Sequence, residues 1–324
     1  MAERGAGQTD YGAMRSAMLV ALTAVCWGLA GGIGGILLDE GWGSFVVSFY
    51  RGIIGLLFVL AWLLLRPGHS GLANPRLWLW SVVAGLGVAG NFSFYFLSIS
   101  EGSVAVAATL MYCAPVFVFL VSFILKIEQL TAFKLAAIVV VIIGIALLTG
   151  IYDVGGSRIT PTGIGAGLLA GLSYAMFIFG FKYAGRYGSP QAILTIAFAV
   201  LALVLIWPAG SDQVVAVLST PDWPMFLTLG VLGAGFSFIF YIVGLSNTAP
   251  TVASIVAMVE PVTASLFGVM LLNESLAGIQ FFGMGLILVT VTALSAHSNS
   301  GSRYVPHSRG AHILQKLRNR MRRH

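Results

Sequence analysis

The sequence predicts an all-α polytopic membrane protein with ten transmembrane helices, arranged as two inverted five-helix repeats. Three observations predict this fold: the composition, a series of ten long apolar runs, and an internal repeat. Of the 324 residues, 58% are hydrophobic and 9% are charged, whereas an average soluble domain is about 45–50% apolar and about 25% charged. A water-soluble fold of this size could not cover its surface with so few charges, and the same figures exclude collagen, a disordered protein and a disulfide scaffold.

Each of the ten runs is long enough to cross a bilayer as a helix. A span needs about 20 apolar residues, whereas outer-membrane strands show alternating segments of about 10 residues. The first run exceeds the apolar core of about 7–15 residues in a signal peptide, so we expect a retained helix. Cys26 and Cys113 lie inside runs and are expected to be packed thiols. The runs lie near residues 15–38, 44–65, 77–98, 103–125, 131–150, 162–184, 189–208, 223–246, 251–272 and 276–296.

Glycines recur at four-residue spacing in two of the runs. This spacing lets helix backbones approach closely where lipid provides no hydrophobic driving force, so it predicts tight helix packing. The glycines concerned are Gly28/Gly32 and Gly31/Gly35 in the first run and Gly163/Gly167/Gly171 in the sixth.

The positions of lysine and arginine orient the chain. When the N-terminus is placed inside, every Lys and Arg except Arg51 and Arg158 falls on the inner side. The positive-inside rule then predicts cytoplasmic N- and C-termini, and we expect a multi-pass protein of the bacterial inner (plasma) membrane. The net charge of +6 fits an anionic membrane surface rather than nucleic acid. The basic stretch Ile313–His324 is expected either along anionic lipid headgroups or as a solvated tail.

The chain aligns with itself at an offset of 146 residues. Over residues 95–130, ten positions are identical to those 146 residues later, among them Tyr95/Tyr241, Pro115/Pro261 and Glu128/Glu274. Because each half holds an odd number of spans, the second half must enter the membrane upside down. Inverted repeats are typical of secondary transporters, which bind substrate near the midplane and alternate its access between the two sides. The predicted divisions are residues 1–14 (cytoplasmic segment), 15–150 (repeat 1), 151–296 (repeat 2) and 297–324 (basic cytoplasmic tail).

Several sequence strings carry a family resemblance over about residues 15–296. They are "CWGLAGGIGG" at 26–35, "FYRG" at 49–52, "APVFVFLVSFILKIEQL" at 114–130 and "EPVTASLFGVMLLNESL" at 260–276. Together they resemble the EamA-type domain of the drug/metabolite transporter superfamily, and within it the YddG-type exporters of aromatic and other amino acids. The resemblance implies an inner-membrane secondary transporter that exports small metabolites through a central cavity. The charges depart from repeat symmetry, since the seventh run has no counterpart of Arg51 and Glu260 corresponds to Ala114.

Polar and aromatic side chains at mid-depth of the runs are the candidate substrate contacts. In the third run Asn91, Tyr95 and Ser98 share one helical face, and Ser237 and Tyr241 share one in the eighth. Such groups could bind a zwitterionic amino acid while aromatic walls accept its side chain. The alternatives are core packing of the aromatic residues and, for Asn91, a hydrogen bond between helices. The complete predicted substrate-binding set is Trp27, Asn91, Tyr95, Ser98, Tyr174, Ser237 and Tyr241.

Two ionisable residues and two prolines lie deep inside the runs. A charge at a helix centre costs about 2.5–3.5 kcal/mol or more, so Arg51 and Glu260 should face the interior. Glu260 is expected to couple transport as a proton carrier, to bind a substrate ammonium, or to make a structural hydrogen bond. Arg51 is expected to bind a substrate carboxylate, to snorkel outward, or to make a structural pair. Pro115 and Pro261 predict helix breaks that shape a cavity.

Motifs of other function classes are missing from the sequence. It has no HExxH, no Walker A motif and no intramembrane nucleophile–base pair, so we expect no enzyme, no metal and no cofactor. Export of phosphate-bearing compounds would need several Lys or Arg side chains facing the interior. The runs hold too few of them, so we do not expect such cargo. Export of lipophilic drugs or other metabolites, and a non-transporting membrane scaffold, remain alternatives, and coupling by facilitated diffusion or proton exchange stays open. The expected partners are a small-molecule substrate, an amino acid above all, and the lipid bilayer, with the chain acting as a monomer.

Overall fold

The structure is a computed structural model that describes residues 3–101, 104–127, 131–153, 160–271 and 275–301. The predicted all-α membrane fold is confirmed, because these ranges are almost entirely helical and contain no strand. Within them, nine segments are long and apolar enough to cross a bilayer, and Gly278–Leu294 is a shorter apolar helix at the position of the tenth. Glu128, Arg158, Glu274 and the tail after residue 301 lie outside the described residues, together with the lipid contacts expected of that tail.

The helices follow the predicted runs, with longer ends and three interruptions. α1 begins at Glu3 rather than near residue 15, although its membrane-spanning part is Met14–Asp39. The first half contains α1 (Glu3–Asp39), α2 (Ser44–Leu65), α3 (Pro75–Ser100), α4 (Val104–Met111), α5 (Ala114–Ile124), α6 (Ala132–Thr149) and the short η1 (Ile151–Asp153). The second half contains α7 (Pro161–Ala184), α8 (Pro190–Ala209), α9 (Ser211–Ala216), η2 (Val217–Ser219), α10 (Trp223–Gly230), η3 (Val231–Phe236), α11 (Ser237–Ser246), α12 (Pro250–Val256), α13 (Val259–Leu271) and α14 (Gly278–Gly301).

The interruptions lie in the fourth, eighth and ninth spans. α4 gives way to α5 immediately before Pro115, and α12 gives way to α13 immediately before Pro261. Proline cannot donate a backbone hydrogen bond to the preceding turn, and both prolines stand in the first turn of the new helix, where that bond is not needed. The eighth span has no proline at its interruption. There α10 and α11 are joined by η3, a π-helical turn, and such turns are often found at functional sites.

The starts of the helices are fixed by local sequence signals. Asn74 caps α3 by accepting a hydrogen bond from the Arg76 amide (3.0 Å), and Thr160 caps α7 by accepting one from the Gly163 amide (3.0 Å). Proline stands in the first turn of both helices. These residues satisfy or remove amide groups that would otherwise lack partners at a helix start.

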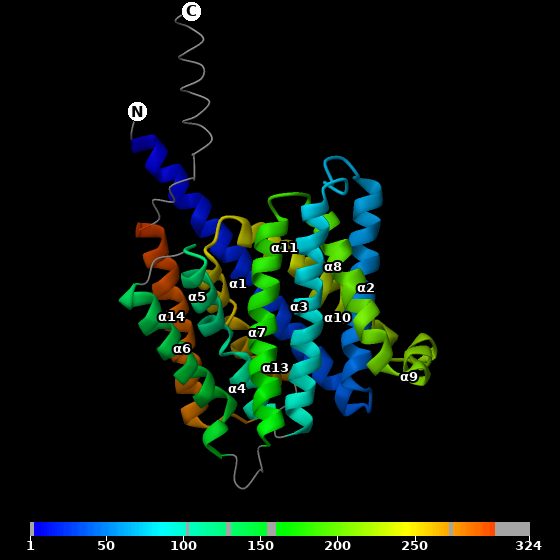
Figure 1. The fold of residues 1–324 in the computed structure, drawn as a ribbon. Helices are drawn as coiled ribbons and strands as arrows, with labels where there is room; N and C mark the ends of the chain where they lie inside the picture. Colours follow the sequence, from blue (N-terminus) through cyan, green and yellow to red (C-terminus); the bar gives the residue numbers. More distant parts are fainter. Residues whose placement is uncertain (1–2, 102–103, 128–130, 154–159, 272–274, 302–324) are drawn as a thin grey trace, which may run out of the picture.

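The two halves are inverted with respect to one another. Figure 1 shows α1 and α7, the first helices of the two halves, running in opposite directions, while α1 begins and α14 ends at the same end of the bundle. The antiparallel pair α3 and α7 is joined by Ser98, whose hydroxyl donates to the Gly163 carbonyl (2.8 Å). The pair α1 and α11 repeats this arrangement through Thr23, whose hydroxyl donates to the Ser237 carbonyl (3.0 Å). The halves therefore meet along two symmetry-related helix pairs.

Close packing explains only part of the glycine pattern. A Cβ at Gly28 would lie 2.6 Å from the Glu260 carbonyl oxygen of α13, and one at Gly171 would lie 3.0 Å from the Met111 carbonyl oxygen of α4. Both positions need glycine, because a side chain would push the neighbouring backbone away. A Cβ at Gly31 or Gly35 would meet nothing within 4 Å, so the second predicted packing face of α1 is not used.

Candidate functional site

Five aromatic rings from three helices meet where the two halves join. We call this group the aromatic cluster. Trp27 of α1 lies at its centre, with ring centroids 5.0 Å from Phe238 and 5.1 Å from Tyr241, both on α11. Phe177 and Phe181 of α7 complete the cluster, and Phe177 lies 6.3 Å from Trp27 in an edge-to-face arrangement. These spacings are typical of favourable aromatic packing, so the cluster forms a close-packed apolar layer.

Four polar atoms in and beside this layer have no hydrogen-bond partner. Each is buried, and each belongs to a residue of the predicted substrate-binding set. An unpaired buried donor or acceptor costs about 1–3 kcal/mol, so several in one place mark a site where a ligand or water would bind. The atoms are the Trp27 indole nitrogen, the Tyr174 hydroxyl, the Ser237 hydroxyl and the Tyr241 hydroxyl.

Asn91 and Ser98 are placed differently from the expectation. The Asn91 amide is buried and donates to the Ala170 carbonyl of α7 (3.0 Å), and Ser98 makes the corresponding bond to Gly163. The expectation that Asn91 faces a cavity is therefore corrected, because its donor joins two helices. Ser237, the residue that corresponds to Asn91 at the 146-residue offset, has the unpaired hydroxyl instead.

A second group of residues, which we call the charged site, lies next to the aromatic cluster. Arg51 of α2 donates from Nε (3.0 Å) and Nη2 (2.8 Å) to the Gly233 carbonyl, and its guanidinium lies 5.4 Å from the centroid of the Phe92 ring. Gly233 belongs to the π-helical turn η3, which alters the regular α-helical hydrogen bonding of the eighth span. Arg51 is thus hydrogen-bonded to the backbone of the eighth span and remains half-buried.

Glu260 supplies the negative charge of this site. It stands in the first turn of α13, where the helix dipole favours a carboxylate, and its side chain is half-buried. It lies near enough to Arg51, Tyr95, Tyr112 and Tyr174 for electrostatic interaction with each of them. Within the described residues no direct ion pair joins Arg51 to Glu260. The charged site therefore contains two opposite charges, both half-buried, that make no direct ion pair within the described residues.

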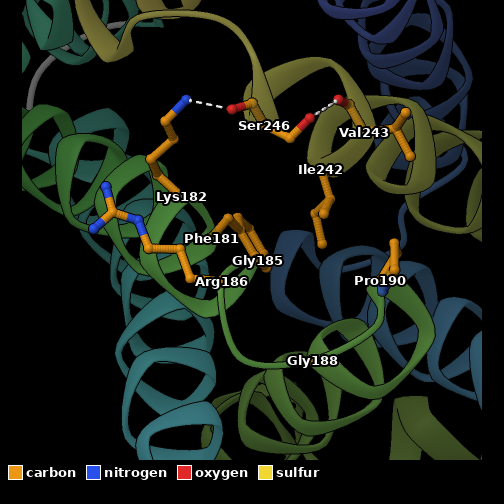
Figure 2. A pocket seen from close by; sticks show the side chains of 9 residues that line it. All are labelled: Phe181, Lys182, Gly185, Arg186, Gly188, Pro190, Ile242, Val243 and Ser246. Atoms are coloured by element: carbon orange, nitrogen blue, oxygen red, sulfur yellow. Dashed lines mark hydrogen bonds between the residues drawn. The ribbon is translucent and has the colours of Figure 1, made fainter. Parts of the chain in front are cut away.

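A cavity of about 330 Å³ lies on the other side of the aromatic cluster. Figure 2 shows it between the end of α7, the start of α8 and the last turn of α11. Its wall includes Phe181, which separates the cavity from the rest of the aromatic cluster, with ring centroids 5.8 Å from Phe238 and 6.3 Å from Tyr241. Lys182 closes one side by donating to the carbonyls of Leu245 (2.5 Å), Ser246 and Thr248.

The order of these features along one span shows that the cavity and the charged site are separate. Gly233 precedes Tyr241 by about two helical turns, and the cavity residues Ile242, Val243 and Ser246 follow Tyr241 toward the far end of α11. The aromatic cluster therefore divides the two. The charged-site residues Arg51 and Glu260 keep exposed surface, whereas the cluster side chains are buried.

Some members of the site were missed by the sequence analysis. Phe238 and Phe181 lie beside Tyr241 and Trp27 but carry no polar group that would have marked them. Tyr112, which lies near Glu260, stands three residues before Pro115 and was not among the predicted substrate contacts. The Gly233 carbonyl was not predictable, because no side chain reveals a π-helical turn. Among the described residues, no group of three His, Cys, Asp or Glu is placed to hold a metal ion.

Comparison with known proteins matches both halves of the chain to one family. The sequence model of the EamA-like transporter family matches residues 14–150 and again 161–296. The chain is 29% identical over 281 residues to an uncharacterized transporter of Archaeoglobus fulgidus, which covers 84% of this chain and 93% of the relative. It is 24% identical over 208 residues to the threonine/homoserine exporter RhtA of Escherichia coli (strain K12), which covers 63% of this chain and 66% of that protein.

The fold is also similar to a solved crystal structure. The two superpose with a TM-score of 0.70 over 88% of this chain and 98% of the other, at 22% sequence identity. At that identity the likeness concerns the fold alone.

Proposed function

This chain belongs to the EamA-like transporter family, and on that premise we propose that it exports small metabolites, above all amino acids with aromatic and other apolar side chains. The observation that carries the proposal is the set of four unpaired polar atoms beside the charged site, at the junction of two inverted halves. A secondary transporter binds its cargo near the midplane between its repeats. The substrate therefore contacts Trp27, Tyr174, Ser237 and Tyr241.

The chemistry of this place suits an amino acid. A small amphipathic molecule needs an apolar surface for its side chain and polar partners for its ends. The aromatic cluster offers the first, and the unpaired indole and hydroxyl groups with the charged site offer the second. The similarity to RhtA, a threonine/homoserine exporter by name, supports cargo of this class.

We assign the aromatic cluster the role of the closed gate in alternating access. It separates the cavity beside Phe181 from the half-buried Arg51 and Glu260, so a substrate at one side has no open route to the other. Ser246 and the cavity lie at the end where α1 begins, since a Cβ at Gly244 would lie 2.7 Å from the Ser16 carbonyl oxygen. The distribution of Lys and Arg supports a cytoplasmic location for that end, in a bacterial inner membrane. The proposed unit is a monomer without cofactor.

The experiment that tests this function uses purified protein in liposomes. Vesicles loaded with unlabelled amino acids, sugars or cationic drugs are diluted into the corresponding labelled compound, and counterflow is measured with and without a pH gradient. The proposal expects counterflow of phenylalanine and other apolar amino acids, and none of sugars. If drugs but no amino acids show counterflow, the chain would instead be an exporter of lipophilic drugs. If no compound shows counterflow, a non-transporting membrane scaffold would be supported.

The matched control is a variant that keeps the fold and changes no residue of the proposed site. Tyr183 stacks on Trp80 at 4.6 Å, away from the aromatic cluster, so Tyr183→Phe removes a hydroxyl of the same kind outside the site. This variant should transport amino acids as the unmodified chain does.

A further inference from the structure

The π-helical turn η3 takes up one residue more than a regular α-helical turn would at this place. The Ser237 amide, directly after η3, donates to the carbonyl of Leu232, five residues back. In an α-helix it would donate to the carbonyl four residues back, which is that of Gly233. Arg51 of α2 uses this carbonyl instead, through hydrogen bonds from Nε (3.0 Å) and Nη2 (2.8 Å). The guanidinium thus occupies the acceptor that an α-helical turn would need.

The helix α2 lies so close to η3 that Arg51 reaches the backbone of the turn. A Cβ at Gly233 would lie 3.0 Å from Nε of Arg51, and a Cβ at Gly55 would lie 2.5 Å from that of Ala234. The guanidinium also lies 5.4 Å from the centroid of the Phe92 ring of α3. Arg51 is therefore held in place by the backbone of one span and by an aromatic ring of another.

The first repeat provides an internal comparison without the arginine. At the 146-residue offset Arg51 corresponds to Ala197 of α8, and Gly233 corresponds to Gly87 of α3. The helices α8 and α3 are also closely packed, because a Cβ at Gly85 would lie 2.5 Å from the Ala197 carbonyl oxygen. Yet α3 is α-helical from end to end. The repeat with the arginine has the π-helical turn, and the repeat with alanine has a regular helix.

The turn determines which side of α11 meets the aromatic cluster. Successive residues of an α-helix lie about 100° apart around the axis, so an α-helical turn of the same residues would rotate α11 by about 100° relative to α10. In the structure the Ser237 carbonyl accepts a hydrogen bond from the Thr23 hydroxyl of α1 (3.0 Å). The Tyr241 ring lies 5.1 Å from that of Trp27, also on α1. The rotation would turn Ser237 and Tyr241 away from these partners.

We propose that Arg51 is a positioning residue that holds η3 in its π-helical form and thereby keeps Ser237 and Tyr241 directed at the transported amino acid. This inference rests on the proposed function, in which both residues contact the substrate. Hydrogen bonds from a charged donor are about twice as strong as neutral ones, so the guanidinium competes well with the Ser237 amide for the Gly233 carbonyl. Arg51 acts on transport through the orientation of α11.

The test combines a change of Arg51 with the removal of one residue from the turn. Deletion of Ala234 places Ser237 four residues after Leu232, so the turn closes as an α-helix without rotating α11. Arg51→Met has no donor for the Gly233 carbonyl. In the liposome counterflow assay, Arg51→Met alone should raise the half-saturating concentration of L-phenylalanine roughly tenfold. The deletion alone should change it by less than about twofold, and Arg51→Met should add less than about twofold in the deleted chain.

A direct role in substrate binding gives a different result. If Arg51 acted only by binding the substrate, its replacement would cost the same in the intact and in the deleted chain, and that outcome overturns the inference. Arg51→Lys keeps one charged donor, so it should recover part of the loss in the intact chain. It should have little effect in the deleted chain.

Tyr50→Phe is the matched control for the loss of a hydrogen bond from α2. The Tyr50 hydroxyl, next to Arg51 in sequence, also donates to a backbone carbonyl of the second half, that of Val214 (2.6 Å), outside η3. Its removal should leave the half-saturating concentration unchanged. An increase equal to that of Arg51→Met would mean that any contact of α2 with the second half matters, which overturns the specific role of Arg51.

A second measurement follows the rotation of α11 without transport. Val243 lies on the exposed side of α11 and lines the cavity (Figure 2). In a chain whose two native cysteines are replaced by alanine, a water-soluble thiol reagent should label Val243→Cys. Arg51→Met should slow this labelling severalfold, because residue 243 turns away from the cavity, and deletion of Ala234 should restore it. Unchanged labelling in Arg51→Met would overturn the inference.

The two measurements separate this inference from the proposed function. If the unmodified chain shows no counterflow of L-phenylalanine, the proposed function fails, and the labelling still decides whether Arg51 orients α11. If counterflow occurs but the deletion rescues neither transport nor labelling, only the positioning role fails. Should Arg51→Met not fold, Arg51→Lys takes its place in both measurements, with a smaller effect expected in the intact chain and little in the deleted one.

Discussion

Tyr95 and Tyr241 occupy equivalent positions in the two repeats, yet they lie in different surroundings. Tyr241 is fully buried in the aromatic cluster, 5.1 Å from Trp27, and its hydroxyl has no partner. Tyr95 is half-buried and lies within the electrostatic influence of Glu260. The inverted repeat thus places one tyrosine in the proposed gate and its counterpart near Glu260, so the two equivalent residues have different surroundings.

Tyr241→Phe separates binding from stability. Removing a buried hydroxyl that has no partner takes away a desolvation cost, so the unfolding free energy should stay unchanged or rise by about 1 kcal/mol. Counterflow of phenylalanine should nevertheless weaken, because the substrate loses a hydrogen bond. Thermal unfolding in detergent and counterflow measure the two effects. A clear fall in stability would mean that the hydroxyl has a partner in the folded chain.

Asn91→Ala should show the opposite pattern. The variant loses the bond to the Ala170 carbonyl, and such bonds between membrane helices contribute about 0.6 kcal/mol on average and up to about 1.7 kcal/mol. The midpoint of thermal unfolding should fall, while the concentration of phenylalanine at half-maximal counterflow stays unchanged. A large change in that concentration at unchanged stability would return Asn91 to the substrate contacts.

Gly180→Ala tests how closely α7 and α3 approach. A Cβ there would lie 2.6 Å from the Ala84 amide nitrogen, which is backbone and cannot rotate away. Overpacking of this kind costs about 1–3 kcal/mol. Gly165→Ala in the same helix is the matched control, because its Cβ would meet nothing within 4 Å. Thermal unfolding should distinguish the two, and equal midpoints would contradict the observed approach of the helices.

Lys182→Met tests the closure at the cavity. Lys182 donates to three carbonyls at the end of α11 and in the following turn, and hydrogen bonds from charged groups contribute about 1.5–3 kcal/mol. Its loss should lower the unfolding midpoint more than Lys126→Met, a change at an exposed lysine. If both variants unfold alike, Lys182 does not join α7 to α11 in solution.

The fold was predictable because a bilayer imposes simple rules on sequence. Apolar runs of span length, their odd number in each half and the arginine distribution are sufficient for two inverted five-helix repeats. The family resemblance carried by strings such as "FYRG" is confirmed by the match over both halves. The YddG-type specificity stays a prediction, as do the domain boundaries and the membrane in which the chain resides.

Candidate site residues could be predicted only where their chemistry and their spacing along one helix were sufficient. The mid-depth position of Trp27, Tyr174, Ser237 and Tyr241 follows from spacing along their helices, and their role as substrate contacts stays a prediction. Helical spacing predicts the side of the helix on which Asn91 lies, but not which neighbouring helix packs against that side. In the structure that neighbour is α7. The bond from Arg51 to Gly233 depends on a π-helical turn 182 residues away, which no local pattern reveals.

The central claim is that amino acids cross this membrane protein through the site where its two halves join. Counterflow of labelled L-phenylalanine tests it most directly, in liposomes containing the unmodified chain, Trp27→Phe or Trp80→Phe. The account predicts clear uptake by the unmodified chain, a severalfold loss in Trp27→Phe and no loss in Trp80→Phe, whose ring stacks on Tyr183 outside the site. Uptake no higher than in empty liposomes, or equal sensitivity to both tryptophan changes, would contradict it.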